Sequence, residues 1–190
     1  MTRLLVISDS SSLIIGTKAG LLDAMCDEFR VEIPEKVFEE TVVVGKGLQK
    51  IDALKIEEAI EENKIVIKKA EPLKESKEAK WLSQLNLDKG ETEAIKLYLQ
   101  TNAKLLLVDD RQAINAAKLL GINWVTIPDI IMGLAERRKI SREKALEALK
   151  IAQMEGRYKI DFILKAFTKI EKIKEGKNEN RTRFRKIRKE

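Results

Sequence analysis

The stretch "LLLVDDRQA", residues 105–113, decides the fold class. Three leucines and a valine in unbroken succession are typical of a strand buried on both faces, as in a parallel sheet covered by helices. Two adjacent aspartates, Asp109 and Asp110, end this strand, and residues 111–121 have the apolar spacing of a helix. A second apolar strand is expected at residues 122–127, and this strand–helix–strand order indicates a parallel α/β fold.

The same alternation extends outward over most of the chain. We expect strands at residues 3–9, 29–34, 65–70, 104–108 and 122–127, and helices at 11–25, 34–47, 48–64, 75–85, 90–103, 111–121, 129–139, 141–156 and 158–176. The pattern predicts a three-layer α/β/α sandwich with a central parallel sheet, plus C-terminal helices. We place the α/β domain at residues 1–138, a helical extension at 139–176 and a basic, flexible tail at 177–190.

The composition limits the chemistry that the chain can carry. Its 190 residues include no histidine and a single cysteine, Cys26. Any metal site must therefore use oxygen ligands, which favours Mg²⁺ or Mn²⁺ over zinc. No apolar run approaches the roughly 20 residues of a membrane helix, so we expect a cytoplasmic protein with no membrane partner. The excess of Lys and Glu over Asp resembles that of heat-adapted proteins.

The net charge of +6 is concentrated in the tail. Residues 177–190 hold seven basic and two acidic residues, whereas the rest of the chain holds 30 basic and 29 acidic residues. A dense basic tail is typical of contacts with nucleic acid, and it can equally keep a protein in solution. The candidate nucleic-acid-binding residues are Arg181, Arg183, Arg185, Lys186, Arg188 and Lys189.

Acidic residues follow two of the expected core strands. Asp9 is the last residue of the strand expected at residues 3–9, and Asp109 and Asp110 follow residues 104–108. The carboxyl ends of parallel strands meet at one edge of a sheet, so these acids are expected to converge. Carboxylates this close raise each other's pKa unless a cation lies beside them. Capping of the following turn is the simpler interpretation of Asp9, but one cap does not explain a pair of aspartates.

Four blocks, in this order, resemble the acidic motifs of the PIN domain family. They are "VISDSSSLI" (6–14), "IPEKVFEETV" (33–42), "KGETEAIKL" (89–97) and "LLLVDDRQAINAAKLLGI" (105–122). The resemblance covers roughly residues 3–130. The segments "LAERRKIS" and "EGRY" resemble the C-terminal helices of a prokaryotic, especially archaeal, PIN subfamily. The resemblance implies an α/β/α sandwich and a metal-dependent nuclease that acts mostly on RNA.

Carried over motif by motif, the resemblance implies a set of site residues. Catalytic residues and metal ligands are Asp9, Glu40, Glu93 and Asp110, with Asp109 as a further metal ligand and Ser11 and Glu91 in supporting positions. Glu40 lies six residues after Pro34, and Glu39 is the neighbouring alternative. Glu93 is preferred over Glu91, although many family members have Asp at this ligand. The threonine often found in the last block is replaced here by Val108.

The expected function is that of an endoribonuclease using Mg²⁺ or Mn²⁺, with RNA as its partner. It could be a toxin held by an antitoxin or an RNA-processing factor, and it could form a homodimer. The alternative is a catalytically weak PIN-like module for RNA binding or assembly. A haloacid dehalogenase would need an acid where Ser11 stands, and no GxxxxGK[ST] phosphate-binding loop occurs.

Overall fold

The computed structural model describes residues 3–173, so the predicted basic tail lies outside the described residues. Its centre is a five-stranded sheet in the order β3-β2-β1-β4-β5, and every neighbouring pair is parallel. The strands are β1 (Leu4–Ser8), β2 (Phe29–Pro34), β3 (Ile65–Lys68), β4 (Leu105–Leu107) and β5 (Trp124–Val125). The predicted α/β class with a central parallel sheet is confirmed.

Helices connect the strands and follow the last one. They are α1 (Ser10–Lys18), α2 (Leu22–Glu28), α3 (Glu35–Phe38), the π-helical η1 (Glu39–Val44), α4 (Gly45–Gly47), α5 (Ile51–Glu61), α6 (Lys77–Gln84), α7 (Lys89–Gln100), α8 (Arg111–Leu119), α9 (Ile127–Glu136), α10 (Arg142–Glu155) and α11 (Ile160–Glu171). The helix predicted at residues 11–25 is wrong in one respect, because it is divided into α1 and α2. Gly20 lies between them at a φ of +67°, a left-handed conformation that glycine adopts without steric cost.

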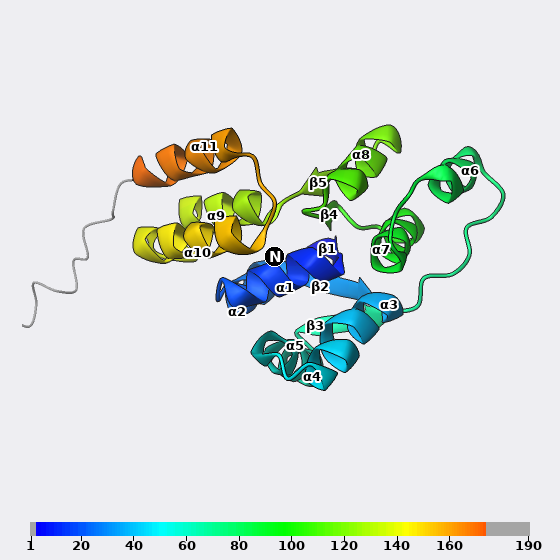
Figure 1. Ribbon diagram of the computed structural model, residues 1–190, viewed down its shortest axis with the longest axis horizontal. Coiled ribbons are helices and arrows are strands. Elements are labelled where there is room, and N and C mark those ends of the chain that lie inside the picture. Colours follow the sequence, from blue (N-terminus) through cyan, green and yellow to red (C-terminus); the bar gives the residue numbers. More distant parts are fainter. Residues whose placement is uncertain (1–2, 174–190) are drawn as a thin grey trace, which may run out of the picture.

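The sheet has an apolar core on each face (Figure 1). Successive residues of β1 point to opposite faces. Val6 packs in the core that α1, α2, α5 and α9 cover, and Ile7 packs in the core that α6, α7 and α8 cover. Leu107 and Leu106 of β4 divide in the same way. The buried leucine run in the sequence therefore serves both faces.

The C-terminal helices join the first of these cores. Ala148 and Leu149 of α10 and Ile163 of α11 belong to the same apolar cluster as Leu13 of α1. Figure 1 shows α9, α10 and α11 side by side, next to α1 and α2. The domain boundary at residues 138 and 139 stays a prediction.

The strand order reverses between β1 and β4. From β1 the chain proceeds to β2 and β3 on one side, and β4 and β5 are added on the other. In an open parallel sheet, ligands bind outside the carboxyl ends of the strands at such a point. The backbone N–H of Asp9 donates to the carbonyl of Leu107 at 3.1 Å, which joins the ends of β1 and β4. The topology thus brings Asp9 to the strand end that precedes Asp109 and Asp110.

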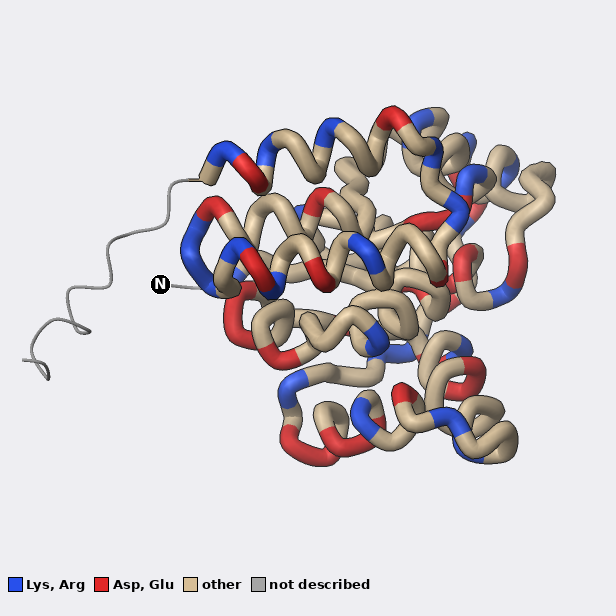
Figure 2. Tube along the Cα trace, turned by 60° about the vertical axis from the view of Figure 1, so that its left-hand side comes forward, with Lys and Arg blue, Asp and Glu red and all other residues tan. Residues whose placement is uncertain are grey.

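Charges are mixed over the described surface. Figure 2 shows Lys and Arg positions interspersed with Asp and Glu positions along the helices, in agreement with the nearly neutral count outside the tail. Between residues 3 and 173, no helix combines the length and the apolar character that crossing a bilayer requires.

Candidate active site at the carboxyl ends of β1 and β4

Asp9 is a buried carboxyl at the end of β1, with only 1% of its surface exposed. It is the N-cap of α1, because its Oδ1 accepts the backbone N–H of Ser12 at 2.8 Å. Its Oδ2 accepts the hydroxyl of Ser11 at 3.1 Å, the supporting contact that the resemblance implies. The pKa of Asp9 is raised to about 7, chiefly by burial and also by the charge of Asp109, whereas the hydrogen bonds from Ser12 and Ser11 lower it.

The two adjacent aspartates after β4 have different partners. Asp110 is the N-cap of α8, and its Oδ1 accepts the backbone N–H of Gln112 at 2.6 Å. Asp109 instead accepts the backbone N–H of Ile127, at the start of α9, at 3.0 Å. Burial raises the pKa of Asp109 above its usual range. Asp109 is therefore not a second cap of α8.

Glu40 reaches the same edge from the π-helical turn η1. Its Oε2 accepts the hydroxyl of Ser10, the residue after Asp9. Glu39, the neighbouring alternative, is exposed and pairs with Lys36 Nζ at 2.6 Å. A Cβ placed on Gly90 would lie 2.4 Å from Glu40 Oε2, so any larger residue at position 90 would displace the carboxylate of Glu40. Single π-helical turns occur frequently at functional sites.

The two glutamates of "GETEAI", Glu91 and Glu93, accept hydrogen bonds from different segments. Glu91 is buried and accepts the backbone N–H of Asp88 at 3.1 Å in a capping box. Burial, with the charges of Asp88 and Asp110, raises the pKa of Glu91 to about 7. Glu93 accepts the backbone N–H of Lys36 at 3.3 Å, at the start of α3. The structure thus brings Glu91, the alternative, beside Asp110, whereas the preferred Glu93 contacts α3.

We refer to Asp9, Glu40, Glu91, Asp109 and Asp110 as the acidic edge. A further residue here was missed by the sequence analysis: the hydroxyl of Tyr158 donates to Asp109 Oδ1 at 2.6 Å. The only signal was its place in "EGRY", because nothing in the sequence pairs it with an acid 49 residues away.

The acidic edge consists of carboxylates, the oxygen ligands that a hard divalent cation prefers. Within residues 3–173, no three His, Cys, Asp or Glu side chains are arranged to share one metal ion. The carboxyls act on one another in pairs, Asp9 with Asp109 and Glu91 with Asp110. Mg²⁺ usually takes one or two protein carboxylates and completes its shell with water and substrate phosphate. Asp109 Oδ2, buried without a donor among the described residues, is an oxygen suited to such an ion.

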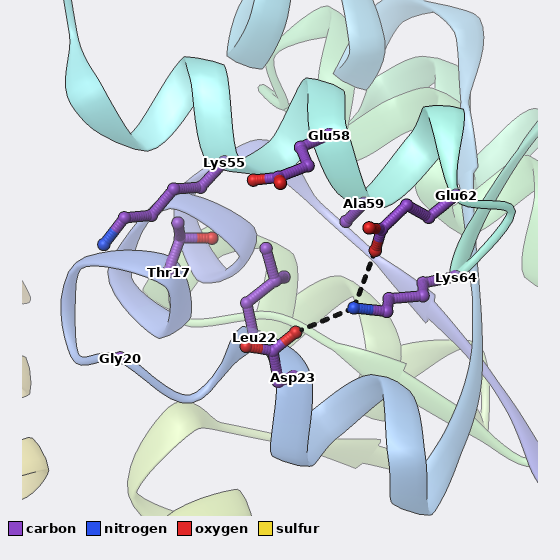
Figure 3. Close-up of a pocket in the computed structure, with 9 residues that line it drawn as sticks. All are labelled: Thr17, Gly20, Leu22, Asp23, Lys55, Glu58, Ala59, Glu62 and Lys64. Carbon is purple, nitrogen blue, oxygen red and sulfur yellow. Dashed lines mark hydrogen bonds and ion pairs between the residues drawn. The ribbon is translucent and has the colours of Figure 1, made fainter.

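A separate pocket of about 300 Å³ lies away from the acidic edge (Figure 3). Lys64, which precedes β3, is one of its lining residues, so the pocket lies toward the amino end of that strand. Lys64 Nζ contacts Asp23 Oδ1 at 3.1 Å and Glu62 Oε2 at 2.7 Å. Two of the carboxylates of this pocket, Asp23 and Glu62, are thus compensated by a lysine, unlike those of the acidic edge.

One comparison with known proteins identifies a family for the chain. The family model described as "DUF3368: PIN domain" matches residues 5–173. No curated protein matches the chain. One solved structure that resembles it is "A domain of a functionally unknown protein from Methanocaldococcus jannaschii DSM 2661", with 22% identity and a TM-score of 0.42 over 65% of this chain and 91% of that one. The chain belongs to the PIN domain family, whose members are generally nucleases.

Proposed function

We propose that this protein is a metal-dependent ribonuclease that hydrolyses phosphodiester bonds at the acidic edge with Mg²⁺ or Mn²⁺. The observation that carries the proposal is the buried pair Asp9 and Asp109 at the ends of two adjacent central strands. The groups that act most strongly on the Asp9 carboxyl are Ser12, Ser11 and Asp109, and none of them is basic. Uncompensated buried carboxylates are costly, and binding a cation removes that cost.

The residues of the chain hold the carboxylates in place for this chemistry. The N-terminus of α1 and Ser11 orient Asp9, Ser10 orients Glu40, and the N-terminus of α8 orients Asp110. A bound divalent cation supplies relief of the phosphate charge and a lowered pKa for the attacking water. We propose both Glu91 and Glu93, the residue that the sequence favours, as candidates for the third acid. Substituting each of them separately distinguishes their roles.

Two exposed arginines are suited to bind a polyanionic substrate. Arg111 follows Asp110 directly and Arg157 precedes Tyr158, and both are exposed. Neither guanidinium group makes an ion pair or a hydrogen bond within the described part of the chain. Arginine binds phosphate oxygens through parallel N–H donors. We propose that these arginines contact the RNA backbone next to the acidic edge and that the tail at residues 177–190 adds further phosphate contacts.

The test is cleavage of end-labelled single-stranded RNA by the full chain in Mg²⁺, Mn²⁺ or EDTA. Asp9→Asn is the inactive variant, and Asp27→Asn, an exposed aspartate on α2, is the matched control. We expect cleavage that needs a divalent ion, is kept by Asp27→Asn and is lost in Asp9→Asn. Equal cleavage by Asp9→Asn would contradict the proposed site.

A second function, RNA binding or assembly without catalysis, is favoured by one observation. Asp9, Asp110 and Glu93 each accept a backbone N–H and thus have structural roles of their own. RNA that is bound but never cut in any metal would support this function. Within the nuclease proposal, the helical extension and the basic tail favour RNA processing over a toxin held by an antitoxin.

A further inference from the structure

The loop between α10 and α11 places a tyrosine hydroxyl on one of the buried acids. Tyr158 donates a hydrogen bond of 2.6 Å to Oδ1 of Asp109. The same oxygen accepts the backbone N–H of Ile127 at 3.0 Å. Because both donors act on one oxygen, they hold the carboxylate of Asp109 in a single orientation.

Gly156 makes room for this tyrosine. A Cβ on Gly156 would lie 2.2 Å from Cε2 and 2.8 Å from Cζ of the Tyr158 ring. An aromatic ring is rigid, and a half-buried ring in a close-packed setting has no small adjustment that relieves such an overlap. The glycine and the tyrosine of "EGRY" therefore form one steric unit, and its place at the end of α10 directs the hydroxyl to Asp109.

The second oxygen of Asp109 is left without a donor. Asp109 Oδ2 and the hydroxyl of Ser12 are both buried, and neither has a hydrogen-bond partner in the part of the chain that the structure describes. Ser12 is close enough to lower the pKa of Asp109, and the charge of Asp109 acts on Asp9. These three side chains therefore lie together. A carboxylate oxygen without a donor, beside a second buried acid, is a suitable ligand for a hard cation.

The tyrosine acts only as a hydrogen-bond donor. A phenol, whose pKa is ordinarily about 10, keeps its proton at neutral pH, so Tyr158 is the donor in its hydrogen bond to Asp109. Its hydroxyl contacts Oδ1 and leaves Oδ2 free. Residues that hydrogen-bond to a metal ligand in this way fix its orientation and its basicity.

We propose that Tyr158 is a positioning residue for cation binding. Its hydrogen bond to Oδ1 of Asp109 orients the carboxylate so that Oδ2 stays unpaired beside Asp9. The segment between α10 and α11 thereby contributes to cation binding at the acidic edge. The inference rests on the proposed metal-dependent function. A tyrosine that only anchored these helices would affect the stability of the protein without affecting the affinity of the folded protein for a metal ion.

The experiment is a titration of the full chain with Mn²⁺, in which electron paramagnetic resonance reports free Mn²⁺. Tyr158→Phe removes one hydroxyl and keeps the ring. We expect it to weaken Mn²⁺ binding about 10- to 100-fold, the loss typical of removing a group that orients a metal ligand. The matched control is Tyr98→Phe on α7, where no hydrogen bond of the hydroxyl is found within residues 3–173. This control should bind Mn²⁺ as the parent does.

A double-mutant cycle with Asp109→Asn shows whether the hydroxyl acts through Asp109. In that background, Tyr158→Phe should cause no further loss of Mn²⁺ affinity. A full further loss would overturn the inference, as would parental affinity in the single variant while the parent still cleaves RNA. A parent that neither binds Mn²⁺ nor cleaves RNA would overturn the proposed function as well. Urea unfolding in EDTA, run on each variant, establishes that the titrated protein is folded.

Discussion

Replacing Asp9 by asparagine is expected to stabilise the metal-free protein above neutral pH while removing its cation-dependent function. The side chain is buried, and its pKa is raised from the ordinary value of 3.8 to about 7, chiefly by that burial. A carboxyl whose pKa is higher in the folded state contributes stability below its unfolded pKa, and this contribution is lost as the pH rises through the folded pKa. Asparagine is uncharged at every pH and suffers no such loss.

The size of the effect follows from the two pKa values. At about 1.36 kcal/mol per pKa unit, the difference between 3.8 and about 7 costs the folded parent about 4 kcal/mol above neutral pH. Asparagine can still accept the backbone N–H of Ser12, but its amide group replaces the oxygen that accepts the hydroxyl of Ser11. Leaving a polar group without its partner costs about 1–3 kcal/mol, which reduces the gain. We therefore expect Asp9→Asn to be more stable than the parent by about 1–3 kcal/mol at about pH 8.

The assay is urea unfolding in EDTA at about pH 5 and about pH 8, because the advantage of the variant should grow with pH. Asp27→Asn, at an exposed position, should leave the free energy of unfolding almost unchanged at both values. In saturating Mn²⁺ the order should reverse, since an ion at about 1,000 times its Kd adds about 4.1 kcal/mol to the parent. A variant that in EDTA is no more stable than the parent at the higher pH would refute the reasoning.

Three further predictions concern the same edge, and a fourth concerns the basic tail. Glu40→Gln should reduce RNA cleavage by at least about tenfold, whereas Glu39→Gln should not, because only Glu40 contacts Ser10. Glu91→Gln should weaken Mn²⁺ binding more than Glu93→Gln does, because only Glu91 is beside Asp110; calorimetric titration would show the reverse order if Glu93 were the ligand. The stabilisation that Mn²⁺ confers in thermal unfolding should grow between about pH 6 and about pH 8, because the ion competes with protons on carboxyls whose pKa is about 7. Removing residues 177–190 should weaken RNA binding and flatten its salt dependence, and an unchanged salt slope would mean that the tail makes no phosphate contacts.

The sheet and the convergence of the acids could be predicted because they depend on local signals and on one general rule. The unbroken apolar run before Asp109 indicates a strand buried on both faces, and parallel topology brings the end of that strand to Asp9. The division of α1 from α2 was harder to predict because a glycine inside an apolar helical pattern is compatible with a continuous helix. The structure shows that Gly20 instead adopts the left-handed backbone conformation.

The parts of the site that depend on tertiary packing could not be predicted from the sequence. Glu91 and Glu93 are two residues apart on one helix, and the cap at Asp88 determines which of them turns toward Asp110. The contact between Tyr158 and Asp109 depends on how α10 packs on the body of the protein, and no periodicity in the sequence encodes that packing.

The most direct test of the account is anomalous diffraction at the manganese edge from crystals of the full chain soaked in Mn²⁺. The account predicts a peak at the carboxyl ends of β1 and β4, within ligand distance of Asp9 or Asp109. An ordered crystal in saturating Mn²⁺ with no peak there, or with its only peak beside Lys64 in the separate pocket, would contradict it.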